Sequence, residues 1–161
     1  MTFTDLPKNW RRRPLTDPGL AADVVDLYCS AGDRRRGTLT LFICDERDRF
    51  RGAVVIDLCD LAVEPLPKRG VGPQSARPIG RAAGLRPVIK PLQVFPGGAL
   101  MLALSRSGPA TTTAADREWV DAAIRVCRSL GVRLLGFYLA SRDAVFPADV
   151  TTAVVDLPAA A

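Results

Sequence analysis

Histidine is absent from this sequence, and lysine and aromatic residues are scarce. Histidine titrates near neutral pH without help and is the commonest metal ligand, so its absence excludes a Ser-His-Asp triad, a Cys-His pair and a histidine zinc site. A lysine, tyrosine or carboxylate base and a magnesium site built from aspartates stay open. The only lysines are Lys8, Lys68 and Lys90. The remaining basic residues are arginines, which stay protonated and therefore make poor general bases.

Closely spaced cysteines are also missing. The four cysteines, Cys29, Cys44, Cys59 and Cys127, form no CxxC pair, which excludes a zinc ribbon and a thioredoxin-like motif. Each stands in an apolar pattern that is typical of a buried, reduced thiol. Because Cys44 and Cys59 fall on neighbouring predicted strands, a disulfide between these two stays open.

No apolar run is long enough to cross a bilayer, and the first five residues lack the basic-then-apolar order of a secretory signal. A chain of 161 residues, of which 48% are hydrophobic, is the size of one domain with a sizeable core. We therefore expect a soluble cytoplasmic protein with one domain.

The order of patterned segments predicts a single α/β domain over residues 17–147, between an N-terminal arm (1–16) and a C-terminal tail (148–161). Asp17 and Pro18 are typical of a helix start, and the apolar period predicts a helix over 18–31 with a connector after it. Alternating segments predict a hairpin of strands 38–44 and 52–59. The later part contains two predicted buried strands, a helix and a short strand: 99–105, 132–140, 114–130 and AVFP. A strand–helix–strand unit makes parallel neighbours, so we expect a mixed sheet with helices packed on it.

Residues 60–98 interrupt this pattern. They hold seven of the thirteen prolines and several arginines and lysines. Proline at this density disfavours long helices and inner strands, so the segment is predicted to be a long, partly mobile loop with a short helix around 79–84.

Several phrases resemble the RadC-like branch of the JAB/MPN (JAMM) metalloprotease-like fold. TLTLFICDERDRFRG is similar to the hairpin of that family, and SLGVRLLGFYLASRDAVF is similar to its closing segment. Between them the family has a strand that ends in HxHPxxxxxxSxxD, and Thr113 and Asp116 stand at the Ser and Asp positions. The resemblance covers residues 37–59 and 92–147 and implies a JAB/MPN-like α/β fold.

The departures from that motif concern the metal site. Ala103 and Ser105 stand at the two histidine positions and Arg106 at the proline. One remaining carboxylate, Asp116, cannot hold zinc in a tetrahedral site, and without zinc no bound water is activated. The resemblance therefore implies a pseudoenzyme without a cofactor, in which Asp116 and Thr113 cap the helix that follows.

The net charge is +5, and two arginine triplets contribute to it. The first triplet follows an aromatic residue, and a basic face of this kind is a candidate site for nucleic-acid phosphates. Arginine at a helix end also complements the helix dipole, and a tryptophan also packs into a core. The candidate nucleic-acid residues are Trp10, Arg11, Arg12, Arg13, Arg34, Arg35 and Arg36.

Three functions stay open from the sequence. The first is a catalytically inactive JAB/RadC-like domain that contacts a protein partner or a second copy of itself. The second is a basic accessory protein that binds nucleic acid weakly, linked to DNA repair through the resemblance. The third is an enzyme of unrecognised type, against which the absence of histidine and of converging carboxylates weighs.

Overall fold

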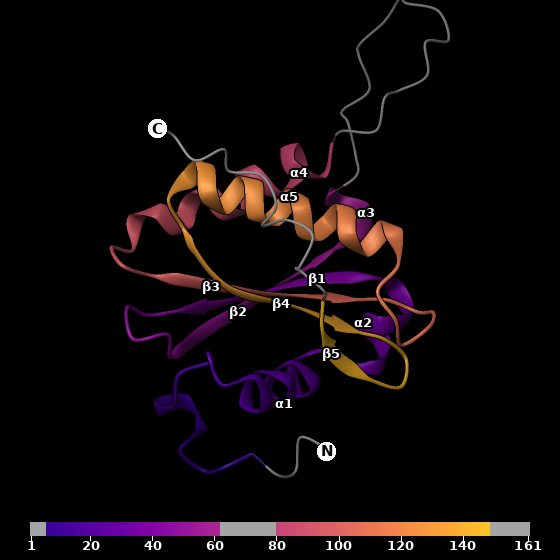
Figure 1. Ribbon diagram of the computed structural model, residues 1–161, viewed down its shortest axis with the longest axis horizontal. Helices are drawn as coiled ribbons and strands as arrows, with labels where there is room; N and C mark the ends of the chain where they lie inside the picture. The colour runs from indigo at the N-terminus through magenta and orange to yellow at the C-terminus, as the bar shows by residue number, and fades with distance from the viewer. Residues whose placement is uncertain (1–5, 62–79, 149–161) are drawn as a thin grey trace, which may run out of the picture.

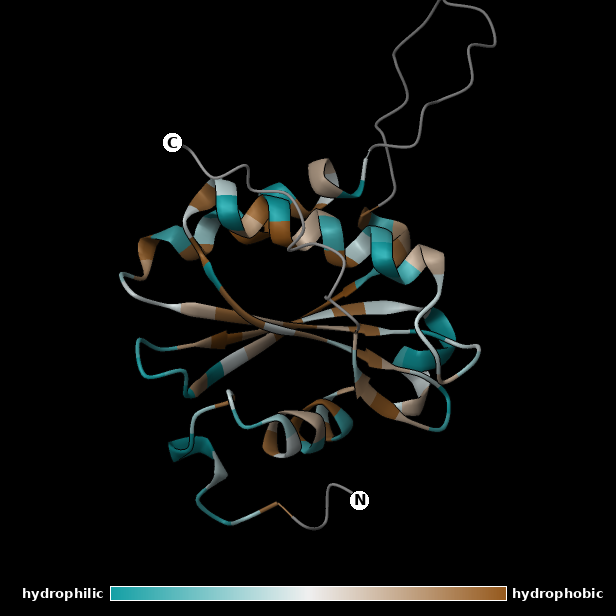
Figure 2. Cartoon of the chain, in the orientation of Figure 1, coloured by the Kyte–Doolittle hydropathy of each residue, from teal (hydrophilic) through white to brown (hydrophobic). Residues whose placement is uncertain are grey.

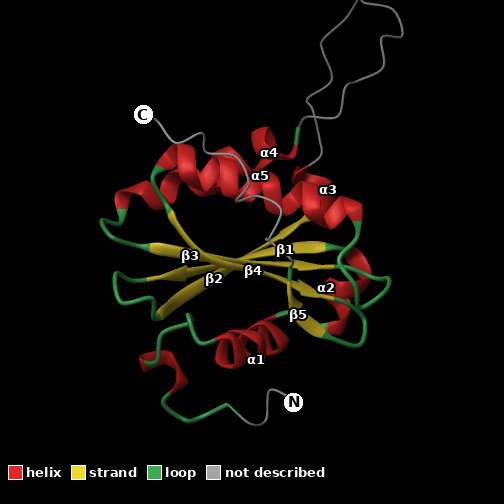
Figure 3. Ribbon diagram, viewed as in Figure 1, coloured by secondary structure: helices red, strands yellow, loops and turns green. Residues whose placement is uncertain are grey.

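The computed structural model describes residues 6–61 and 80–148. Five strands form one sheet in the order β2-β1-β3-β4-β5, with helices on both faces (Figure 1). Helices α3, α4 and α5 cover one face, and α1 covers the other, so the molecule has three layers (Figure 3). The sequence prediction of a mixed sheet with packed helices in a single α/β domain is confirmed. Among the described residues, no helix combines the length and apolar character needed to span a bilayer.

The sheet combines both strand directions. β1 (Thr38–Cys44) pairs antiparallel with β2 (Phe50–Asp57) on one side and with β3 (Ala99–Ser105) on the other. β3 runs parallel to β4 (Arg133–Ala140), and β5 (Val145–Pro147) pairs antiparallel with β4. The predicted hairpin and the predicted parallel pair of strands are therefore both present.

Helix α5 (Ala114–Leu130) makes the crossover between the two parallel strands, as predicted. It begins at Thr113, whose side chain accepts a hydrogen bond from the Asp116 N–H, and it ends at Gly131 with a φ of 68°. A left-handed conformation of this kind favours glycine because a Cβ crowds the backbone there. The residues that α5 buries are Asp116, Val120, Ala122, Ala123, Val126, Cys127 and Leu130. Trp119 is partly buried and packs against the same core.

The predicted helix over 18–31 is wrong at its C-terminal end. α1 (Pro18–Tyr28) stops early, and the predicted connector is a second helix, α2 (Ala31–Arg36). The reason is a capping box at Ser30 and Asp33, where each side chain accepts a hydrogen bond from the backbone N–H of the other residue. The pattern Ser-x-x-Asp is visible in the sequence but was read as part of one longer helix.

The proline-rich stretch contains more helix than predicted. α3 (Leu58–Leu61) follows β2, and α4 (Arg81–Ile89) continues into a 3-10 helix, η3 (Lys90–Val94). Leu85 and Ile89, one turn apart, are fully buried, and their burial keeps α4 helical although Pro87 lies inside it. Residues 62–79, which are nearly half of the predicted loop, lie outside the described residues, as does the tail from 149 onwards.

Alternation along the strands divides the core between the two faces of the sheet. Leu39, Leu41, Leu100 and Leu102 pack under α4 and α5, whereas neighbouring residues such as Met101 pack under α1. All seven residues of β3 are buried, as expected for the central strand of a sheet covered on both faces. Figure 2 shows the apolar strands enclosed between helices whose outer sides are hydrophilic.

Candidate functional site

The carboxylate at the last position of the degenerate motif is held by an arginine. Arg106 donates from Nε and Nη2 to the two oxygens of Asp116, each at 2.7 Å. The same guanidinium donates to the carbonyl oxygens of Ser107, Pro109 and Thr111, so it spans the loop between β3 and α5. Asp116 is 1% exposed. A bidentate pair of this geometry fixes the loop against the first turn of α5.

The helix cap uses the remaining hydrogen-bonding capacity of Asp116. One carboxylate oxygen accepts from the Thr113 N–H at 2.8 Å. Burial raises the pKa of Asp116, but hydrogen bonds from Arg106 and Thr113 more than offset burial, and the pKa is lowered overall. The ionised carboxylate is therefore a structural anion, and the capping role expected for Thr113 and Asp116 is present.

The other two motif positions lie elsewhere. Ala103 belongs to the core on the α1 face, whereas α5, which carries Asp116, packs on the opposite face. Ser105 is fully buried, and its hydroxyl lies beside the Cys29 thiol. Within residues 6–61 and 80–148, no three aspartate, glutamate or cysteine side chains gather as metal ligands would. The structure thus keeps Thr113 and Asp116 together in the helix cap and places Ala103 on the opposite face of the sheet from α5.

A basic hollow lies where the parallel strands β3 and β4 end. It has a volume of about 500 Å³. Its lining residues are Ala31, Arg34, Arg35, Ser107, Arg142 and Asp143. Ligands of open α/β sheets commonly bind outside the carboxyl ends of parallel strands, which is where Ser107 and Arg142 lie. The hollow carries more positive than negative charge, so its chemistry favours an anion.

Two members of the second arginine triplet already serve the fold. Arg34 donates to the Cys29 carbonyl, at the end of α1, and forms an ion pair with Asp26 at 2.8 Å. Arg36 forms an ion pair with Asp33 at 2.9 Å. Arg35 is exposed and pairs with no described carboxylate, so it is the member of the triplet that is available to a ligand.

The first triplet lies at the opposite end of the sheet. The ring centre of Trp10 lies 5.1 Å from that of Phe50, and Trp10 is only 9% exposed, as expected for the alternative in which it packs into the core. The Arg11 guanidinium stacks 5.3 Å from the Trp10 ring centre, and Arg13 pairs with Asp17. A backbone bridge between residues 14 and 49 holds the N-terminal arm, with the first triplet, beside the β1–β2 turn at the end of β1. The second triplet lies in α2, just before the start of β1. The two triplets therefore do not form one continuous basic face.

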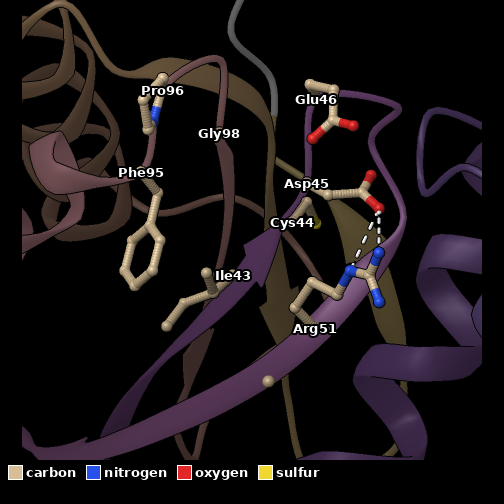
Figure 4. Close-up of a pocket in the computed structure, with 9 residues that line it drawn as sticks. Ile43, Cys44, Asp45, Glu46, Arg51, Phe95, Pro96 and Gly98 are labelled. Atoms are coloured by element: carbon tan, nitrogen blue, oxygen red, sulfur yellow. Dashed lines mark hydrogen bonds and ion pairs between the residues drawn. The ribbon is translucent and has the colours of Figure 1, made fainter.

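A second hollow, of about 520 Å³, lies beside the β1–β2 turn (Figure 4). The apolar side chains of Ile43 and Phe95 face each other across it, and Phe95 is 58% exposed. Arg51 donates to the Asp45 carboxylate at 3.1 Å. Burial raises the pKa of Asp45, but hydrogen bonds from Arg49 and neighbouring groups lower it to about 2. An apolar wall beside neutralised charges is typical of a contact surface.

The cysteines supply no reactive centre in the core. Burial raises the pKa of Cys44 to about 12 and that of Cys127 to about 11, so both remain neutral thiols. Burial also raises the pKa of Cys29, and the neighbouring Ser105 and Thr40 hydroxyls oppose this rise only in part. Cys59 lies exposed in α3, not on a strand beside Cys44, and all four cysteines are free. The open question of a Cys44–Cys59 disulfide is thereby answered.

Sequence reasoning missed two arginines at this end of the sheet. From the sequence, Arg106 stands only at the proline position of the motif, and Arg142 has no predicted role. Arg106 follows directly on β3, and Arg142 lies two residues after the end of β4, so both are at the carboxyl ends of the parallel strands. Comparisons with family models, with curated proteins and with solved structures give no match to this chain.

Proposed function

We propose that this chain is a non-catalytic domain with a JAB/MPN-like arrangement, of the RadC-like kind, which works by contacting a protein. The observation that carries the proposal is the Arg106–Asp116 pair. The one carboxylate left in the degenerate motif binds a guanidinium with both oxygens and caps α5, so its charge is already paired and a metal ion would have to compete with Arg106 for it. The order of hairpin, strand, helix and parallel strand supports the arrangement.

The proposal predicts the metal content of the purified chain. Elemental analysis should find no stoichiometric zinc, because zinc needs several protein ligands in tetrahedral geometry. Asp116→Asn should lower the stability of the fold and leave the metal content unchanged. Asp121→Asn, on the exposed side of the same helix, is the matched control. One zinc per chain, lost in Asp116→Asn and kept in Asp121→Asn, would contradict the non-catalytic role.

The basic hollow favours a second candidate function, the weak binding of nucleic-acid phosphates. Exposed Arg35 and Arg142 come from separate elements and line the same hollow beside Ser107. Contacts of arginine with phosphate release counterions, so the affinity should be micromolar, indifferent to sequence and strongly weakened by salt.

A titration of a fluorescent duplex and of a single strand at two salt concentrations tests this candidate. Arg35→Ala combined with Arg142→Ala should abolish binding. Arg12→Ala, at the other end of the sheet, should bind like the wild-type chain. No binding by the wild-type chain at low salt, or an equal loss in the Arg12 variant, would rule out a phosphate site in the hollow.

A further inference from the structure

Strand β2 presents an open edge of the sheet. Its only partner strand among the described residues is β1, and the single bridge beyond that pair lies at residues 14 and 49, before the strand begins. Val54 and Val55 point to opposite faces and are 45% and 47% exposed. Natural sheets usually protect an edge with lysine, proline or a very short strand. β2 has eight residues, and its charged residues and its bulge lie towards its ends, so the uncharged middle over residues 52–56 is suited to pairing with another strand.

The phase of the hydrogen bonds shows which backbone groups are available. The Leu58 N–H donates to the Gly37 carbonyl, and this pair is in register with the Ile56–Leu39 and Val54–Leu41 pairs. Bonded and non-bonded pairs alternate along an antiparallel ladder. The N–H and C=O groups of residues 52, 54 and 56 therefore face β1, and those of residues 53, 55 and 57 face outward. A second strand can pair with this edge only if its own outward-facing N–H and C=O groups lie opposite those of residues 53, 55 and 57.

We propose that β2 pairs antiparallel with β2 of a second copy of this chain, about a two-fold axis at Val54. This arrangement opposes Val54 to itself, Ala53 to Val55 and Gly52 to Ile56 of the other copy. Both 53 and 55 face outward, as the hydrogen-bond phase requires. Each small residue meets a β-branched residue, so the side chains on both faces complement one another in size.

Charge selects the same register. Centring on Val54 brings Arg51 of each copy opposite Asp57 of the other. The two-fold axis therefore gives two ion pairs, each between an arginine and an aspartate. Within the chain Arg51 pairs with Asp45 at 2.9 Å and Asp57 pairs with Arg36 at 3.6 Å. The side chains of Arg51 and Asp57 are still 63% and 44% exposed, so each can share its charge with the second copy. A shift of the axis to residue 53 or 55 keeps the hydrogen-bond phase but opposes Arg51 to Val55, or Asp57 to Ala53. Arg51 is itself the bulged residue, because Gly52 pairs with Ile43 and Phe50 with Cys44, so the two charges flank a regular core of residues 52–56.

The surroundings of β2 leave room for the second strand. The 3-10 helix η2 (Trp10–Arg12) contacts the Phe50 end of β2, and α3 contacts the Asp57 end. Between them, both faces of the strand are exposed at Val54 and Val55. The interface is small, so we expect a reversible dimer with micromolar affinity. This inference rests on the proposed protein-contact role and names the partner as a second copy.

Sedimentation velocity over a range of concentrations tests the interface. The wild-type chain should pass from monomer to dimer as the concentration rises. Val54→Lys opposes two like charges across the axis and should weaken the dimer at least tenfold. Leu27→Lys replaces a residue of similar exposure (41%) on α1 and should leave the dimer unchanged. A wild-type chain that stays monomeric, or a Val54→Lys dimer of wild-type affinity, would overturn the proposal.

A charge exchange between chains tests the register. Arg51→Glu and Asp57→Arg each oppose like charges in their own homodimer, so each variant alone should dimerise weakly. A mixture of the two restores both ion pairs and should form a heterodimer with near wild-type affinity. Thermal melting of each variant checks that the fold is intact. If the mixture dimerises no better than the separate variants, the register at Val54 is wrong; neither outcome alters the zinc measurement that tests the non-catalytic role.

Discussion

The substitution Arg106→Met removes one partner of a buried ion pair and keeps most of the side-chain volume. The Asp116 carboxylate would then be buried with one backbone hydrogen bond from Thr113 and no counter-charge. Removing one partner of a buried pair costs about 3–5 kcal/mol. The Arg106 side chain is 15% exposed, so water can partly replace it, and we expect a loss of about 3 kcal/mol.

The reciprocal substitution should cost less. In Asp116→Asn the amide oxygen can still accept the hydrogen bond from the Thr113 N–H, and Arg106 keeps its carbonyl partners in the loop. We expect a loss of about 1–2 kcal/mol, as for a weakened helix cap and a lost ion pair. The order of the two losses, with the arginine substitution larger, follows from the greater burial of the carboxylate.

Urea denaturation followed by circular dichroism measures both losses. Arg117→Met replaces an exposed arginine next to Asp116 and should change the stability by less than about 0.5 kcal/mol. A loss of about 3 kcal/mol corresponds to a melting temperature lowered by roughly 6–12 °C in a chain of this size. If Arg106→Met and Arg117→Met unfold at the same urea concentration, the pair does not stabilise the fold and the reasoning is refuted.

Three further predictions concern pH, thiols and one glycine. The pKa of Asp45 is lowered in the folded chain from 3.8 to about 2, so the stability that its ionised form contributes is complete above pH ~4 and is lost as the pH falls towards 2; acid unfolding of Asp45→Asn should therefore show a shallower loss of stability over that range. Titration with a thiol reagent should find one fast cysteine in the native chain, and Cys59→Ser should remove it, whereas a second fast thiol would contradict the burial of the others. Gly84→Ala should destabilise the fold by about 1–2 kcal/mol, although helix propensity alone predicts a gain of about 1 kcal/mol, because the new Cβ would lie 2.7 Å from the Leu61 carbonyl oxygen. Gly32→Ala, whose Cβ meets only ordinary contacts at 3.5 Å, should be neutral or stabilising, and thermal melting of both variants checks the sign.

The sequence by itself determined the elements whose signals are local. Strands 38–44 and 99–105 and helix 114–130 have the predicted bounds, because a continuous apolar run or a capping pattern with a following glycine specifies each of them. The parallel pairing across α5 also followed, since the handedness of a strand–helix–strand unit restricts its layout. The prediction failed at two places. The Ser30 capping box starts a second helix where one longer helix was expected. In α4 the burial of Leu85 outweighs the local effect of the proline, so the segment is helical.

Only the tertiary structure decided which of these residues meet. Arg106 and Asp116 are ten positions apart, and no periodicity pairs them; the loop that returns from β3 to α5 brings the guanidinium onto the carboxylate. The two arginine triplets have the same sequence but lie at opposite ends of the sheet, because the arm that carries the first triplet runs beside the β1–β2 turn whereas α2 lies at the start of β1. The open edge of β2 likewise depends on the strand order, in which β1 pairs with β3 on its other side. Pattern and propensity act over a few residues, whereas the faces, ends and edges of a sheet are properties of strand order, which is set by packing across the whole chain.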